Sequence, residues 1–308
     1  MREFLRITQE AVYGTFNASP TTGEQVLISL PQDNSFTVRK KINSMPIRSA
    51  GANNRRVKMI SRTFDVGGKL MTYVRPSQAA LLATLLGGLT TGDCPTLPSF
   101  TCDHGFMLED GSCTPFITRY TGCMADGVLT ASNTGEGTNM KADLTIIGQL
   151  ATVITTTIFP VPVATDLTAI DNEVPYAFQD CTGALIVGGG RTDFNSISFN
   201  FGNKILPYRG ETAQISRLNW RSRDPSVTID NLYKSKQDRL DYEAITPKAV
   251  SFTFTEGGHS IAFALGANNY FDEPQDDLKV GDGWFMQSIT LQNFIDPATG
   301  IDLAITVV

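Results

Sequence analysis

Four side chains in the sequence are of the types that bind a transition metal. Cys94, Cys102, His104 and Cys113 follow one another closely, and three thiolates with one imidazole can complete the tetrahedral coordination of Zn²⁺. The group has no Cys-x-x-Cys pair, which favours ordinary loop thiols or one disulfide formed after release from the cell. We therefore expect no metal and no other cofactor.

Other residues of types that can act in catalysis or ligand binding lack the neighbours that these functions need. The two histidines, His104 and His259, have dissimilar surroundings, and a general base acts only beside the group that it deprotonates. Residues 188–191 (Gly-Gly-Gly-Arg) lack the Gly-Lys-Ser/Thr ending of a phosphate-binding loop. The acidic residues 272–277 lack the alternation and the glycine of a helix-loop-helix calcium site. The sequence thus predicts a protein that is not an enzyme.

The charge of the chain limits its partners. Its 308 residues have a net charge of −6 and a pI of about 5.0, so no broad positive field can hold nucleic acid by its phosphates. This sign of charge suits a protein past which nucleic acid slides without binding. Charged residues make up 18% of the chain, below the roughly 25% of a typical soluble domain. The deficit favours extensive contacts with other proteins.

The chain shows no pattern for export or for a membrane. Residues 1–10 carry charges where a signal peptide needs an unbroken apolar stretch. The most apolar run, residues 79–89, is far shorter than the ~20 apolar residues that cross a bilayer. We expect folding in a cytoplasm and no contact with a membrane.

The sequence contains four pairs of similar segments in the same order. The pairs are residues 34–38 with 195–199, 45–48 with 206–209, 60–62 with 215–217, and 143–147 with 302–306, at offsets between 155 and 161. Strings of Ser, Thr, Val and Ile shared by any β protein are the alternative explanation, and they account poorly for the proline-centred pair. The repeated order predicts a duplicated domain.

The local patterns predict mostly antiparallel strands. Short β-branched or aromatic segments separated by turn residues are typical of them, and in the first half they cover residues 36–42, 57–64, 69–74, 128–132 and 142–147, with a tight turn at 65–68. Pro76 and the Ala/Leu-rich residues after it, closed by Gly87-Gly88, predict a short, largely buried helix. The charged residues 233–242 predict its solvent-facing counterpart in the second half.

Two domains follow from the repeat. We expect the first at residues 1–165 and the second at 166–308, with the boundary near the proline-containing residues 159–163, which cannot lie inside a strand ladder. Residues 91–115, which contain three cysteines and three prolines, have no evident counterpart and are expected to be an inserted loop.

The order of these features resembles the tail tube proteins of long, non-contractile (siphovirus-type) bacteriophage tails, in their duplicated form. The segments that carry the resemblance are 6–16 (ending Tyr-Gly-Thr-Phe), 66–70, the helix from Pro76 to Gly87, 120–125, 147–148, 194–199, 227–229, 289–291 and 304–307. Each segment by itself is a loose match, and the resemblance rests on the order and spacing of the segments. Residues 91–115 do not match the family pattern.

The resemblance implies a mainly β fold of two tandem tube-type β-sandwich or barrel domains, each with a short helix. It further implies a structural virion protein that self-assembles in the host cytoplasm into homotrimeric, pseudo-hexameric rings. Their sheets join into an inner β-barrel, and the stacked rings form the tail tube for DNA ejection. The implied partners are other copies of the chain and the tail-tip or baseplate, tape-measure and terminator proteins, while DNA passes without specific binding. A tail terminator, baseplate or decoration protein is the alternative within the virion, and a cytoplasmic β-rich enzyme the alternative outside it.

Two sets of residues are candidates for work in such a tube. Asp143 and Asp302 begin apolar strands where an acid is a poor β former, and we predict that they face the bore and repel DNA, with capping of a hairpin in solvent as the alternative. The polar loop Asn133–Asn139 contains Thr134, Gly135, Glu136, Gly137 and Thr138. These five residues are predicted to form an arm that orders on the neighbouring ring.

Overall fold

The structure is a computed structural model. It describes residues 2–21, 24–30, 35–49, 55–87, 97–107, 117–133, 138–154, 164–181, 194–232, 236–274, 279–281, 284–295 and 302–308. Its first half contains β1 (Arg2–Gln9), β2 (Gln25–Ser29), β3 (Ser35–Phe36), β4 (Arg39–Ser49), β5 (Arg55–Tyr73), α1 (Pro76–Leu85), β6 (Phe100–Met107), β7 (Ile117–Ser132), β8 (Lys141–Gly148) and β9 (Leu150–Ile154).

The second half repeats this β-rich character. It contains α2 (Ala164–Asn172), the 3-10 helix η3 (Phe178–Asp180), β10 (Phe194–Asn200), β11 (Asn203–Tyr208), β12 (Arg217–Arg223), β13 (Ser226–Leu232), α3 (Gln237–Glu243), β14 (Ser251–Glu256), β15 (His259–Ala264), β16 (Asn269–Pro274), β17 (Lys279–Gly281), β18 (Trp284–Asn293) and β19 (Ala304–Val307). The predicted mainly β fold is therefore confirmed, and α1 and α3 lie where helices were predicted.

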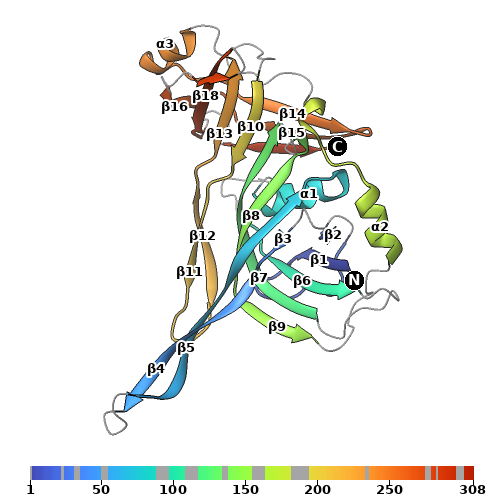
Figure 1. The fold of residues 1–308 in the computed structure, drawn as a ribbon, viewed down its shortest axis with the longest axis vertical. Coiled ribbons are helices and arrows are strands. Elements are labelled where there is room, and N and C mark those ends of the chain that lie inside the picture. Colours follow the sequence, from blue (N-terminus) through green and yellow to red (C-terminus); the bar gives the residue numbers. More distant parts are fainter. Residues whose placement is uncertain are drawn as a thin grey trace.

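The largest sheet contains a row of eight antiparallel strands. Their order is β3–β5–β8–β7–β10–β13–β18–β16, and the row runs through the length of the molecule in Figure 1. The first four strands and the last four follow the same plan, and β7 joins the two sets by pairing with β10. One half of the chain thus continues the sheet of the other, head to tail.

A second layer covers one face of this row. In the first half it is the set β2–β1–β6–β7–β9, and in the second half the set β14–β15–β19. The two sets correspond, because β7 pairs with β6 and β9 as β15 pairs with β14 and β19. Helix α1 buries its Ala and Leu side chains between the halves, where it contacts β2 on one side and β15 and β19 on the other.

The strand registers define which residues of the two halves are equivalent. Phe36 pairs with Leu70, and Ile197 pairs with Ile229, so the match of residues 34–38 with 195–199 falls on the same sheet position. Continuing across the sheet, Leu70 pairs with Leu144 and Ile229 with Ile289. Strand β8 is therefore the counterpart of β18.

The equivalence predicted for Asp143 and Asp302 is wrong. Asp143 lies in β8, and the register gives Ser288 of β18 as its counterpart. Asp302 precedes β19, which belongs to the separate three-stranded sheet. The resemblance of residues 143–147 to 302–306 reflects the common alternation of apolar residues in strands and not a shared place in the fold.

The two halves each contain a hairpin, β4–β5 and β11–β12, with the same irregularity. A bulge lies after Asn43 in one and after Lys204 in the other. The match of residues 45–48 with 206–209 therefore holds in the structure. The third match does not, because residues 60–62 oppose β4 where residues 219–221, and not 215–217, oppose β11.

The tight turn predicted at residues 65–68 is also wrong. Strand β5 passes through it without a break from Arg55 to Tyr73. The glycines serve a close backbone approach, since a Cβ on Gly68 would lie 2.5 Å from the carbonyl oxygen of Thr37. Glycine in a strand can mark such an approach as well as a turn.

The expected inserted loop at residues 91–115 is only partly a loop. It contains β6, a central strand between β1 and β7 whose counterpart is β14. The proline-containing residues 159–163 lie outside the described residues, and α2 spans the expected boundary between residues 165 and 166.

Candidate functional site

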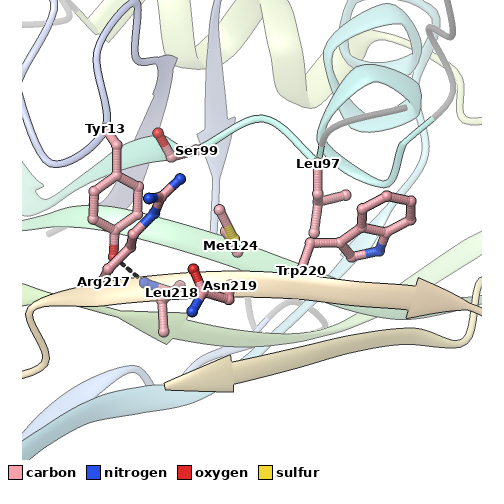
Figure 2. A pocket seen from close by; sticks show the side chains of 8 residues that line it. All are labelled: Tyr13, Leu97, Ser99, Met124, Arg217, Leu218, Asn219 and Trp220. Atoms are coloured by element: carbon pink, nitrogen blue, oxygen red, sulfur yellow. Dashed lines mark hydrogen bonds between the residues drawn. The ribbon is translucent and has the colours of Figure 1, made fainter. Parts of the chain in front are cut away.

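The hairpin β11–β12 lies against the first half of the chain. Leu218 and Ile215 are buried there against Leu97 and Met124, with Ile147 at the margin. We call Leu97, Met124 and Ile147 the filled seat. Figure 2 shows the pocket of about 270 Å³ at this contact, with Tyr13, Met124 and Leu97 facing the strand β12 from the first half.

Tyr13 fastens the hairpin to this seat. The backbone N–H of Leu218 donates to the phenolic oxygen of Tyr13 at 2.8 Å, the dashed line in Figure 2. Burial raises the pKa of Tyr13 to about 12, and the nearby negative charge of Glu10 adds to the effect. The phenol is therefore neutral at physiological pH, as an oxygen that accepts a hydrogen bond inside an apolar contact should be.

The turn that carries Tyr13 is held by one buried carboxylate. Glu10 accepts hydrogen bonds from the N–H of Gly14 at 2.8 Å, the hydroxyl of Thr101 at 2.7 Å and the N–H of Gly122 at 2.8 Å. Gly14 has a φ of 71°, a conformation that favours glycine. The segment 6–16 singled out from the sequence thus positions Tyr13 beside the filled seat.

An ion pair holds the far end of the hairpin. The Arg209 guanidinium pairs with Asp65 and donates to the carbonyl of Phe64 at 3.1 Å. The N–H of Phe64 donates to the carbonyl of Ala213 at 3.1 Å. The first half of the chain thus holds the turn between β11 and β12 through an ion pair and a backbone hydrogen bond.

The hairpin β4–β5 is the counterpart of β11–β12 in the first half of the chain. It projects away from the body of the molecule at the lower left of Figure 1, and its side chains Ile42, Met45 and Met59 are 56%, 53% and 59% exposed. Residues 39–62 contain eight Lys and Arg and no Asp or Glu. Exposed apolar residues together with an unbalanced charge mark a contact surface. This surface was not predicted from the sequence, although the run of Lys and Arg residues is visible there.

The two predicted bore acids have different surroundings. Asp143 lies on the face of the sheet opposite the core, 3.4 Å from the ammonium of Lys69, and the side chains of Asp143 and Lys69 are 42% and 59% exposed. The Nε and Nη2 groups of the buried Arg223 guanidinium donate to the two carboxylate oxygens of Asp302, so its charge is neutralised inside the fold. The role of Asp143 in a bore stays a prediction.

The other sequence candidates are only partly described. Thr134, Gly135, Glu136 and Gly137 lie outside the described residues, and Thr138 begins the return to β8, so the predicted arm stays a prediction. Cys94 and Cys113 also lie outside, and the described part of the chain holds no group of three residues that could bind a metal. Cys102 is a free, buried thiol whose pKa is raised by burial and by the adjacent Cys123. His104 contacts Glu3 at 2.5 Å.

Comparisons with known proteins show the family to which the chain belongs. None of the helices in the described ranges is long and apolar enough to span a membrane. The comparison with curated proteins gives no match. The family model described as phage tail tube protein matches residues 2–292, nearly the whole chain. The chain therefore belongs to the phage tail tube protein family and is a structural component of the phage tail.

Proposed function

We propose that three copies of the chain join head to tail into a ring, and that stacked rings form the tube through which DNA is ejected. The observation that carries the proposal is the junction between β7 and β10 inside one chain. It joins the last strand of one four-strand set to the first strand of the next. Among the described strands, β3 bonds only to β5, while β16 and β17 bond only to β18, so the same junction can form between copies.

The registers say which residues should meet at that junction. Within the chain, Ser196, Ile197 and Ser198 oppose Ser132, Ala131 and Thr130. Their counterparts are Ser35, Phe36 and Thr37 on one copy and Gly281, Val280 and Lys279 on the next. Pairing of these edges in every copy would close the row into a barrel, which removes the open edges that make a sheet prone to aggregation.

The face that such a barrel turns inward suits the passage of DNA. The core layer covers one face of the row, so the other face would line the bore. In the described strands that face carries Asp126, Asp143, Asp230 and Asp272 against Lys69 and Lys141, and most of its other side chains are Ser, Thr or Asn. A net negative charge with short polar groups would repel the phosphates and offer them no binding site.

Val280→Pro should abolish ring and tube formation while leaving a folded monomer. The N–H of Thr37 donates to Lys69 in its own chain at 2.8 Å, and N–H directions alternate along a strand. Phe36 therefore directs its N–H to the free edge, and so does Val280, the residue expected to oppose Phe36 on the neighbouring copy. Proline at position 280 removes a donor that the monomer does not use. Sedimentation velocity and electron micrographs measure the outcome. Val280→Ala keeps the N–H and should assemble, and normal tubes from the proline variant would contradict the pairing.

Replacing Asp143 and Asp230 by lysine should slow DNA ejection at low salt. Each change replaces a charge of −1 by +1, so the two add four positive charges to the face that would line the bore in each chain, which creates repeated phosphate sites along the tube. Phage carrying the variant should regain speed as salt screens the attraction. The variant Asp143→Asn with Asp230→Asn, which adds no cation, should show a smaller delay. Unchanged ejection at every ionic strength would place these residues outside the bore.

Assembly in the host cytoplasm and docking of the tube to tip, tape-measure and terminator proteins complete the proposal. A tail terminator, baseplate or decoration protein is the second candidate. Copy number separates the two, because a tube subunit must be present in many rings of each particle.

A further inference from the structure

We infer that the hairpin β4–β5 of one copy docks on a specific site at the base of the second half of the next copy, the counterpart of the filled seat. This inference rests on the head-to-tail ring of the proposed function and goes beyond it, since edge pairing alone does not say where the projecting hairpin lies. The site is defined by the internal repeat of the chain.

The registers identify the residues that take the place of the filled seat. Met124 pairs with Ile147, and their counterparts Tyr270 and Gln292 pair with each other. The pairing of Phe100 with Cys123 corresponds to the bridge between Lys248 and Asn269. Phe100 and Lys248 are therefore equivalent. Leu97 lies three residues before Phe100 and Ile245 three residues before Lys248, so Ile245 is the counterpart of Leu97. We call Ile245, Tyr270 and Gln292, with the adjoining Phe294 and Ile295, the open seat.

The open seat is apolar and uncovered in the single chain. Ile245, Phe294 and Ile295 are 73%, 53% and 63% exposed, and the rings of Tyr270 and Phe294 contact each other at 5.4 Å between centroids. In the filled seat the equivalent Leu97 is only 5% exposed, because β12 covers it. Contiguous exposed apolar residues of this kind mark a protein contact.

Ile245 is placed in the open seat by the end of helix α3. Its φ is 52°, its N–H donates to the carbonyl of Tyr242 at 3.0 Å, and the N–H of Thr246 donates to the carbonyl of Asp241 at 2.9 Å. These two bonds close the last turn of a helix through a left-handed residue. The helix end thus holds the backbone of Ile245 while its apolar side chain stays exposed.

The hairpin that should fill the open seat has matching side chains. By the shared bulge, Met59 of β5 takes the place of Leu218 of β12. Leu218 is 1% exposed on the filled seat, and Met59 is 59% exposed. An apolar side chain is thus placed where the next copy's open seat can cover it.

A charge pair should lock the docked hairpin. Arg48 is the sequence counterpart of Arg209, and Asp224 is the register counterpart of Asp65, the partner that Arg209 binds. Asp224 is exposed, forms an ion pair with Lys204 of its own chain, and lies beside a hollow of about 610 Å³ that Phe294 and Ile295 also line. In the docked state Arg48 of one copy should compete with Lys204 for the Asp224 carboxylate of the next.

Disulfide trapping tests the docking. In the variant Met59→Cys with Tyr270→Cys, oxidation of assembled tubes should link chains into dimers and trimers on non-reducing gels. Leu218→Cys with Met124→Cys should link within one chain, as the matched positive control. Met59→Cys with Val153→Cys, an exposed residue of β9, should link nothing. If the unmodified protein forms no rings or tubes, the proposed function fails. If tubes form and the Met59–Tyr270 variant shows no link between chains, the docking site alone is overturned.

If the double-cysteine variant does not assemble, a charge swap between Arg48 and Asp224 tests the docking instead. Arg48→Glu and Asp224→Arg should each cause loss of sedimentable tubes, and the two changes in one chain should restore them. Failure of the double variant to assemble, or normal tubes from both single variants, would overturn the docking.

Discussion

Asp103→Ala should lower the free energy of unfolding by about 3–5 kcal/mol, because it removes one partner of a buried, doubly hydrogen-bonded ion pair. Asp103 of β6 and Arg119 of β7 face each other across the sheet, and both guanidinium-to-carboxylate hydrogen bonds are short, at 2.7 and 2.8 Å. The side chains are 5% and 9% exposed. Arg119 also lies 3.6 Å from the ring centroid of Phe16, which ties the opening segment to the same strand.

Urea unfolding of Asp103→Ala, made in the Val280→Pro background so that assembly adds nothing to the measured stability, checks this value. The pair Arg239–Glu243 provides the matched control, since both partners are 56% exposed and Glu243→Ala should cost no more than about 0.5 kcal/mol. Replacing Asp103 and Arg119 together by apolar residues should recover much of the loss. A decrease below about 1 kcal/mol for Asp103→Ala would mean that water reaches the pair.

Shortening the hairpin β4–β5 should abolish tubes and leave the body of the protein folded. Asn43 and Thr63 are cross-strand partners, so a two-residue Asn-Gly turn can join them in place of residues 44–62. The deletion removes Met45, Met59 and most of the cationic residues of the hairpin, and none of the core residues that the structure describes. The expected product is a monodisperse monomer with unchanged β content.

Circular dichroism and sedimentation of the shortened chain measure these two outcomes. Met45→Leu with Met59→Leu keeps the apolar volume of the hairpin and should give normal tubes. Normal tubes from the shortened chain would show that the hairpin is dispensable for assembly.

Features with a local physical cause were predictable from the sequence. Pro76 at the start of α1 needs no N–H partner, and the Ala and Leu residues that follow are buried as their composition predicted. The match of residues 34–38 with 195–199 held because both segments occupy one strand position beside buried partners, Leu70 and Ile229.

Features that depend on distant contacts were not predictable. Gly67 and Gly68 have the composition of a turn, yet they lie within β5, where the backbone of Thr37 passes too close for a side chain. Asp302 has the sequence context of Asp143, and only the fold brings Arg223 to it.

The two assembly surfaces, the hairpin β4–β5 and the open seat, were not predicted from the sequence for a related reason. Among residues 39–62, the described side chains include none that is buried, so no apolar pattern of a packed strand marks the projecting part of the hairpin β4–β5. Its run of eight cations between Arg39 and Arg62 was the available signal. The open seat carries no motif at all and becomes visible only when the registers of the two halves are compared.

A cryo-electron microscopy map of the tube formed by the purified protein would show directly whether the junction inside the chain is repeated between chains. We expect rings of three copies, with β3 of each copy paired to β17 of the next in the register of β10 on β7, and with Met59 over Tyr270. A ring in which the edges β3 and β17 stay unpaired, or in which copies meet through other strands, would contradict this expectation.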